Sequence, residues 1–223
     1  MNKKILLFCL FLAFGVMGYS QYAYRIKADI FTKTRLPDST FQVSKGKLCY
    51  DVNNKKIIFD FTFPQKEKIV LFDTIMYTFR KDTLFSRDKN FLIPDQSLFH
   101  FMLMGKISNY GLDQANFEMI GVDKKKDMII ATWMPPESMK NMISKVLVTT
   151  KEKLLYSVTM IDAKGKVLNR QILKNYKLIQ GLEIPSEILI ATYLDRGNIY
   201  QIINMDNIIL NETKNNGDYD QKL

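Results

Sequence analysis

The sequence has 223 residues, and its 32 Lys or Arg against 23 Asp or Glu give a formal net charge of +9. Acidic and basic residues are interleaved, as in KDTLFSRDK and VDKKKD, which argues against the clustered basic face of a nucleic-acid-binding protein. The length suits a single domain.

The N-terminal residues 1–21, MNKKILLFCLFLAFGVMGYSQ, have the three parts of a secretory signal peptide. Lys3 and Lys4 form the positive start, residues 5–17 form an apolar run, and small or polar residues follow. The apolar run is too short to cross a hydrocarbon core of about 30 Å. The sequence therefore predicts a cleaved signal and export to the periplasm of a Gram-negative-type envelope. The remaining chain carries +7, because this segment holds two lysines and no acid.

The two cysteines predict neither a lipid anchor nor a disulfide. Cys9 lies inside the apolar run and does not follow a small-residue cleavage motif. Removal of the signal leaves only Cys49, and one cysteine cannot form an internal disulfide. The fold is thus expected to depend on its hydrophobic core alone.

Beyond the signal, the dominant hydrophobic period is two, which is the period of strands with one buried face. In residues 57–63, IIFDFTF, the side chains of Phe59, Phe61 and Phe63 fall on one face, and those of Asp60 and Thr62 fall on the other. Turns of hairpin length join most strands, which predicts an antiparallel curved sheet of roughly eleven strands. The strand-like segments are 24–33, 41–51, 57–63, 69–73, 75–80, 117–123, 127–134, 145–150, 154–162, 166–179, 186–195 and 198–205.

Residues 92–112, LIPDQSLFHFMLMGKISNYGL, break this pattern and predict a helix of about three turns. Asp95 or Ser97 is the expected N-cap, and Gly105 or Gly111 the expected end. A weaker helical turn is predicted in 135–143, where Pro136 suits a first helical position. With the signal at 1–21, the sequence predicts one β domain over 22–207 and a polar, flexible tail over 208–223.

Side chains for covalent or metal chemistry are few. Beyond the signal there is one histidine, His100, and one cysteine, Cys49, so we expect neither a metal nor another cofactor. We expect His100 to be a packed side chain with one partner and Cys49 to be a buried, inert thiol. Asp60, Asp73 and Asp82 remain the candidates for an acid pair, because carboxylates of a hydrolase converge from distant strands. No motif supports an enzyme.

The apolar side chains have two interpretations. They fill an ordinary core between a sheet and a covering helix, or they line a cavity that curved antiparallel sheets often leave beneath such a helix. Under the second interpretation, the sheet contributes Phe59, Phe61, Phe63 and Phe79, the helix Phe99, Met102 and Leu103, and Trp133 is a further liner. A shift of one residue in strand phase would exchange the two faces.

The order of these elements resembles the periplasmic lipoprotein carriers and outer-membrane acceptors of the LolA/LolB-like family. The resemblance rests on the strand with Gly46 and Leu48, the strand ending at Pro64, the helix LFHFMLMGKI, the hairpin DAKGKV and the Ile184-Pro185 pair, and it covers residues 24–205. It implies a mainly β, single-domain incomplete antiparallel barrel closed by a helical lid, with an apolar interior that binds acyl chains.

The resemblance leads to a first functional hypothesis: an exported, monomeric, non-enzymatic carrier of lipoprotein acyl chains or another lipid. Its partners would be an inner-membrane exporter and an outer-membrane acceptor. The alternative is an interaction or sensor module of the same fold, with a filled core and an exposed apolar patch that binds a protein. A small hydrolase on a β scaffold is the third reading.

Overall fold

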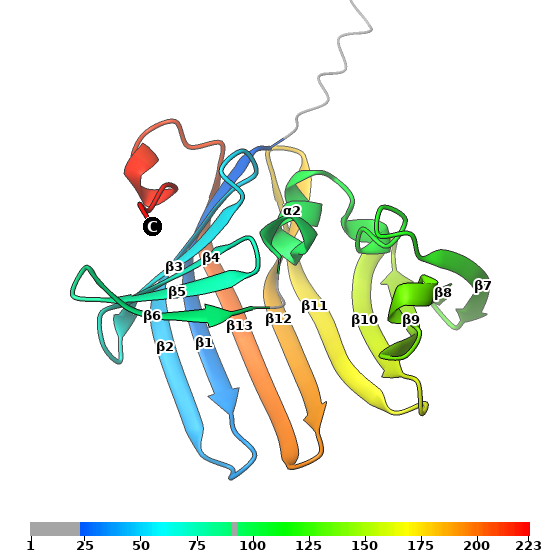
Figure 1. Ribbon diagram of the computed structural model, residues 1–223. Coiled ribbons are helices and arrows are strands. Elements are labelled where there is room, and N and C mark those ends of the chain that lie inside the picture. Colours follow the sequence, from blue (N-terminus) through cyan, green and yellow to red (C-terminus); the bar gives the residue numbers. More distant parts are fainter. Residues whose placement is uncertain (1–22, 91–92) are drawn as a thin grey trace, which may run out of the picture.

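The computed structural model describes residues 23–90 and 93–223, so the predicted signal peptide lies outside the described residues. Thirteen antiparallel strands form one curved sheet (Figure 1), in the order β6-β5-β4-β3-β2-β1-β13-β12-β11-β10-β9-β8-β7. The strands are β1 Arg25–Arg35, β2 Phe41–Asp51, β3 Lys56–Phe63, β4 Glu67–Phe72, β5 Ile75–Arg80, β6 Thr83–Lys89, β7 Glu118–Lys125, β8 Met128–Met134, β9 Ile143–Lys151, β10 Leu154–Asp162, β11 Val167–Ile179, β12 Leu182–Leu194 and β13 Gly197–Leu210.

The sheet consists of two meanders, β1 to β6 and β7 to β13, which are joined where β1 pairs with β13. Its edges are β6 and β7, and these edges do not pair with each other, so the barrel is open. The predicted fold class, a mainly β incomplete antiparallel barrel, is confirmed. Between β6 and β7, residues 93–117 carry the α-helix and two of the 3-10 turns, and they lie across the concave side of the sheet (Figure 1).

Alternation along the strands places the main core on the concave face. In β1, Ile26, Ala28 and Ile30 are buried in this core, whereas Arg25 and Lys27 point to the convex face. The helix α2, Leu98–Leu103, packs over β1 and β12 and covers the core from the concave side. Burial of its apolar side chains, at roughly 25 cal/mol per Å², stabilises this arrangement.

The helical segment is shorter than predicted. It is divided into a 3-10 turn η2 (Pro94–Gln96), α2, and a second 3-10 turn η3 (Ile107–Asn109). Ser97 is the N-cap, and its hydroxyl accepts a hydrogen bond from the backbone N–H of His100. Gly105 has a φ of +66°, and the N–H of Lys106 bonds back to the carbonyl of Phe101, so the helix ends here as in a Schellman motif. The weaker predicted turn is a 3-10 turn η4, Glu137–Met139.

The sequence pattern does not predict strand β6. Its sequence, TLFSRDK, has no alternation, and nearly every residue is exposed because β6 is an edge strand without a cover.

Gly46 lies where the backbones of β2 and β3 pack closely. A Cβ at this position would lie 2.2 Å from the carbonyl oxygen of Asp60 on β3. Among the described residues, no helix has the length and apolar character needed to cross a membrane.

The C-terminal residues differ from the predicted flexible tail. β13 continues to Leu210, and a 3-10 turn η5 (Asn216–Asp218) brings Tyr219 onto the convex face, where it is fully buried. Tyr219 completes a second hydrophobic cluster, which contains Cys49, Ile58, Val70, Tyr77 and Phe79.

Salt bridges hold the tail to the sheet. Lys27 bonds to Asp218 at 2.8 Å and to Glu212 at 3.2 Å, and these contacts, the Asp218 bond first, raise the pKa of Lys27. Lys56 bonds to Asp220 at 2.6 Å, which lowers the pKa of that carboxyl. Polar tail residues thus serve as ion-pair partners, which composition alone does not reveal.

Candidate functional site

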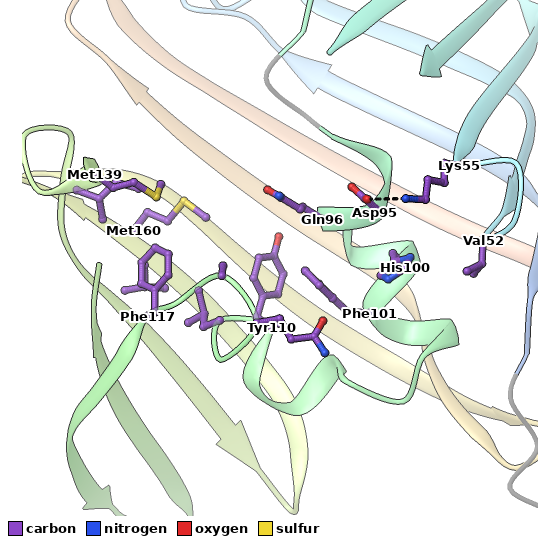
Figure 2. Close-up of a pocket in the computed structure, with 16 residues that line it drawn as sticks. Val52, Lys55, Asp95, Gln96, His100, Phe101, Tyr110, Phe117, Met139 and Met160 are labelled. Atoms are coloured by element: carbon purple, nitrogen blue, oxygen red, sulfur yellow. Dashed lines mark hydrogen bonds and ion pairs between the residues drawn. The ribbon is translucent and has the colours of Figure 1, made fainter. Parts of the chain in front are cut away.

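A cavity of about 510 Å³ lies between the helical segment and the strands β9 and β10. Its volume is in the range of sites that bind small molecules. Figure 2 shows Asp95, Gln96, His100 and Phe101 on the helical side and Met139 and Met160 on the other. The cavity is lined by Val52, Lys55, Asp95, Gln96, His100, Phe101, Tyr110, Gly111, Leu112, Gln114, Ala115, Phe117, Met139, Ile143, Val146 and Met160.

One end of the cavity is apolar. Phe117, Met139 and Met160 gather there (Figure 2), with Ile143 and Val146 of β9 beside them. Methionine side chains are flexible and polarisable, so they adapt to apolar ligands of differing shape. This end offers an apolar surface without a charged group.

The other end is polar and open. Lys55, in the β2–β3 turn, lies 3.3 Å from Asp95 of η2, and both side chains are partly exposed. His100 Nδ1 lies 2.8 Å from the hydroxyl of Tyr50. Burial lowers the pKa of His100, and the nearby Lys106 and Lys55 lower it further against the opposing effect of Asp95. The lowered pKa favours the neutral imidazole, and His100 is half-buried with one side-chain hydrogen bond, to Tyr50.

The segment 107–117 forms a wall of the cavity and is fixed to the sheet by Tyr110. Its hydroxyl donates to Gln171 of β11 at 3.0 Å, and its ring lies 5.6 Å from that of Phe101. Gly111, with a φ of +65°, makes room for Phe101, because a Cβ at Gly111 would lie 2.1 Å from that ring. The wall and α2 are thus packed together as one unit.

Of the predicted sheet liners, the structure brings together Phe59 and Phe61. Both are half-buried, pack against the main core, and stack with ring centroids 6.0 Å apart. Phe63 is separated from them by a register shift and pairs with Lys45, and its side chain is 50% exposed.

Phe79 lies on the opposite face from Phe59. The register sets Phe59 beside Ile69 and Thr78, whereas Phe79 pairs with Lys68, one residue out of phase. Phe79 is buried in the second hydrophobic cluster under Tyr219. The two phenylalanines therefore do not share a surface.

The predicted helix residues Phe99, Met102 and Leu103 are buried in the main core, where they fix α2 to the sheet. Trp133 packs against the same core and pairs across the sheet with Val146, a cavity residue. Its indole Nε1 is buried and has no hydrogen-bond partner among the described residues. The cavity itself is lined by none of the eight predicted site residues.

The residues that do line the cavity are not among the predicted site residues. Tyr110, Leu112 and Phe117 lie in a segment without regular periodicity, so no pattern assigns them to a face. Met139 follows a helical-turn signal, and Val146 and Met160 alternate along strands, but only tertiary packing shows which strand pairs border the cavity. The methionines were the available signal, because flexible, polarisable side chains suit a surface that binds apolar ligands.

Cys49 and the three aspartates considered for catalysis lie outside the cavity, although Asp60 and Asp82 line one small depression together. Cys49 is buried in the second cluster, and burial raises the pKa of its thiol to about 12. Asp60 and Asp82 lie on the convex side near Lys68 and Lys66, and Asp73 occupies a turn with a φ of +52°. In residues 23–90 and 93–223, no group of three or more His, Cys, Asp or Glu side chains is placed to hold a metal ion.

No family model matches this sequence, and no curated protein matches it. Solved structures, by contrast, share its fold. A LolA superfamily protein from Nitrosomonas europaea aligns with a TM-score of 0.60 and 14% identity over 89% of this chain and 91% of that chain. An outer membrane lipoprotein-sorting protein domain from Vibrio parahaemolyticus, described as putative, aligns with a TM-score of 0.63 and 11% identity over 89% and 90%.

A DUF1329 family protein from Desulfovibrio piger gives a TM-score of 0.63 and 10% identity over 90% of this chain and 91% of that chain. The protein therefore has the fold of LolA superfamily and lipoprotein-sorting domain structures, and the resemblance predicted from its sequence is confirmed at the level of the fold.

Proposed function

We propose that this protein is an exported carrier that shelters the acyl chains of lipoproteins, or of another lipid, for transfer across the periplasm to the outer membrane. The observation that carries the proposal is the cavity between α2 and β10, with its apolar end at Met139 and Met160 and its polar end at Lys55 and His100. The apolar end suits an acyl chain, and the polar end suits the polar group to which that chain is attached.

The energetics favour a dedicated carrier. Each buried methylene contributes about 0.8 kcal/mol, so an acyl chain of about sixteen carbons costs on the order of 10 kcal/mol to hold in water. A carrier offsets this cost with apolar surface and needs no covalent chemistry.

The decisive experiment is native mass spectrometry of the protein purified from the periplasm without detergent, followed by organic extraction. Bound acyl-bearing species would support a carrier. A clean apo mass, together with refusal of added fatty acid and lipopeptide, would contradict it.

A second candidate is a module that binds a protein partner, and it is favoured by the edge strand β7. All eight residues of β7 are exposed, including Met119, Ile120 and Val122. Edge strands of this kind are templates for pairing with another chain. If native mass spectrometry shows only the unliganded protein, and the protein does not bind added fatty acid, this becomes the first candidate.

A substitution on the concave face tests whether acyl chains reach beyond the cavity. Phe61→Glu is expected to weaken capture of a fluorescent fatty acid by about tenfold or more, because the carboxylate would replace apolar ligand contacts next to Phe59. Thr62→Glu is the matched control, since Thr62 is the exposed neighbour. If fluorescence titrations show equal losses of fatty-acid affinity in the two variants, the assignment of Phe61 to the ligand-binding face is wrong.

Ligand binding should also slow amide hydrogen exchange in residues 95–110. This segment contributes Asp95, His100, Phe101 and Tyr110 to the cavity, so an occupant adds contacts that oppose its local opening. The measurement is exchange followed by mass spectrometry with and without fatty acid, and peptides from β4 and β5 are the internal control. Unchanged exchange in 95–110 would mean that the segment is not a lid.

A further inference from the structure

The convex side of β1 has two halves with different surroundings. In the first half, Arg25 bonds to Asp51, and Lys27 bonds to Glu212 and Asp218 under the C-terminal tail. In the second half, Lys33 and Arg35 are exposed, and neither forms an ion pair among the described residues. The tail supplies carboxylates to one half only.

The pairing between neighbouring strands continues the uncovered half of β1 into two rows of residues. These rows cross five strands, β2, β1, β13, β12 and β11. The first row is Phe41, Arg35, Tyr200, Ala191 and Arg170, from β2 to β11. The second row is Val43, Lys33, Ile202, Leu189 and Ile172. We call these ten residues the convex stripe. It contains three cations, seven apolar or aromatic side chains and no acid.

The stripe is hollowed where it crosses β2, β1 and β13, and it exposes aromatic rings there. A depression of about 280 Å³ is lined by Lys33, Arg35, Phe41, Tyr200 and Ile202. Phe41 is 59% exposed and Tyr200 41% exposed. The ammonium of Lys33 lies 4.7 Å from the centroid of the Phe41 ring, so cation and aromatic groups are presented together.

Acidic residues flank the stripe but are bonded to other groups. Asp38 accepts from Thr40 in the β1–β2 turn, Asp195 bonds to Lys166, and Glu187 accepts from Asn175. The three cations of the stripe therefore keep their capacity to bind an external anion. Lys45, in the neighbouring row, adds a fourth cation without an ion pair among the described residues.

The first row of the stripe borders two hairpin tips, those of β1–β2 and β12–β13, and these tips touch each other. A Cβ on Gly197, the first residue of β13, would lie 2.7 Å from Pro37 in the β1–β2 turn. Both tips point to the same end of the sheet (Figure 1), and they expose Phe41 and Leu194. Apolar tips with cations directly behind them match the layers of a bilayer surface, in which acyl chains lie below charged headgroups.

We propose that the convex stripe docks this protein onto the surface of a membrane that contains anionic lipids. Phe41 and Leu194 enter the interfacial layer, and Lys33, Arg35 and Arg170 bind the headgroup phosphates. The inference does not depend on the proposed carrier function, because the stripe lies on the opposite face of the sheet from the cavity.

The test is co-sedimentation of the protein, purified from the periplasm, with two kinds of vesicle. One kind contains phosphatidylcholine alone, and the other contains phosphatidylcholine mixed with phosphatidylglycerol. We expect binding to the mixed vesicles only, and weakening as salt is added. Each cation near an anionic surface is worth about a fivefold change in binding, so Lys33→Glu/Arg35→Glu should lower the partition constant by roughly tenfold or more. Phe41→Ser should lower it at unchanged net charge.

The matched control is Lys124→Glu/Lys125→Glu, which makes the same change in net charge at two exposed positions of β7. It should retain most of the binding. The proposal is overturned if the protein does not bind phosphatidylglycerol vesicles, the outcome expected for a surface that binds an acidic protein. It is also overturned if the two double variants lose equal binding, because attraction would then reflect net charge alone.

Discussion

Replacing Met139 by glutamate is expected to weaken fatty-acid binding by about thirtyfold or more, because a carboxylate left unpaired against an acyl chain costs at least about 2 kcal/mol. Met139 lines the apolar end of the cavity with Phe117 and Met160 (Figure 2). It lies in the short turn η4 and is only partly buried, so the substitution leaves the sheet intact. The measurement is titration with a fluorescent fatty acid.

The control for this substitution is three residues away. Met142→Glu makes the same chemical change at a side chain that is 61% exposed and does not line the cavity. Its affinity should match that of the unsubstituted protein. If both variants bind fatty acid normally, the cavity is not where an acyl chain binds.

Loss of the Asp51 carboxylate should lower the free energy of unfolding by about 3–5 kcal/mol, the range for removing one partner of a buried ion pair. Asp51 is almost fully buried, and its Oδ2 lies 2.5 Å from Nε of Arg25. Its Oδ1 accepts from the backbone N–H of Asn53 at 2.7 Å, which fixes the β2–β3 turn. Arg25 in turn lies over the ring of Tyr219, so the pair also supports the tail.

Urea denaturation of Asp51→Ala measures this loss of unfolding free energy. Two further variants are measured for comparison. Asp51→Asn keeps an acceptor for the turn and should be less destabilising than Asp51→Ala. Asp195→Ala breaks a surface pair with Lys166 in which Asp195 is 99% exposed, and should change stability by less than about 1 kcal/mol. A similar small loss for Asp51→Ala would mean that Arg25 finds another partner.

Much of the fold could be predicted because alternation is a local property. In β1 and β3 the apolar residues recur at every second position, and this pattern specifies both the strand and its buried face. β6 could not be found this way, because an exposed edge strand has no face to bury. The tail resisted prediction for a different reason: one aromatic residue, Tyr219, fixes it by filling a hydrophobic cluster on the convex face.

The candidate site was less predictable, because it depends on relations between strands. Phe59 and Phe79 both read as inward-facing, yet the pairing of β3, β4 and β5 sets them on opposite faces. A one-residue difference in register is enough to do this. The cavity wall of residues 107–117 is irregular, and it is positioned by the contact of Gly111 with Phe101 and by the Tyr110–Gln171 hydrogen bond.

The pairing of β1 with β13 has a consequence for how the chain reaches this structure. Every other neighbouring pair of strands is consecutive in sequence, joined by a short turn or, between β8 and β9, by the segment that contains η4. The β1–β13 ladder instead joins segments separated by most of the chain, so its formation carries the largest loop-closure entropy of the sheet. Each meander can assemble from local hairpins, but β1 keeps an unpaired edge until β13 is in place. We therefore expect folding to be limited by this late long-range step, and the intermediate before it to be the species most exposed to aggregation.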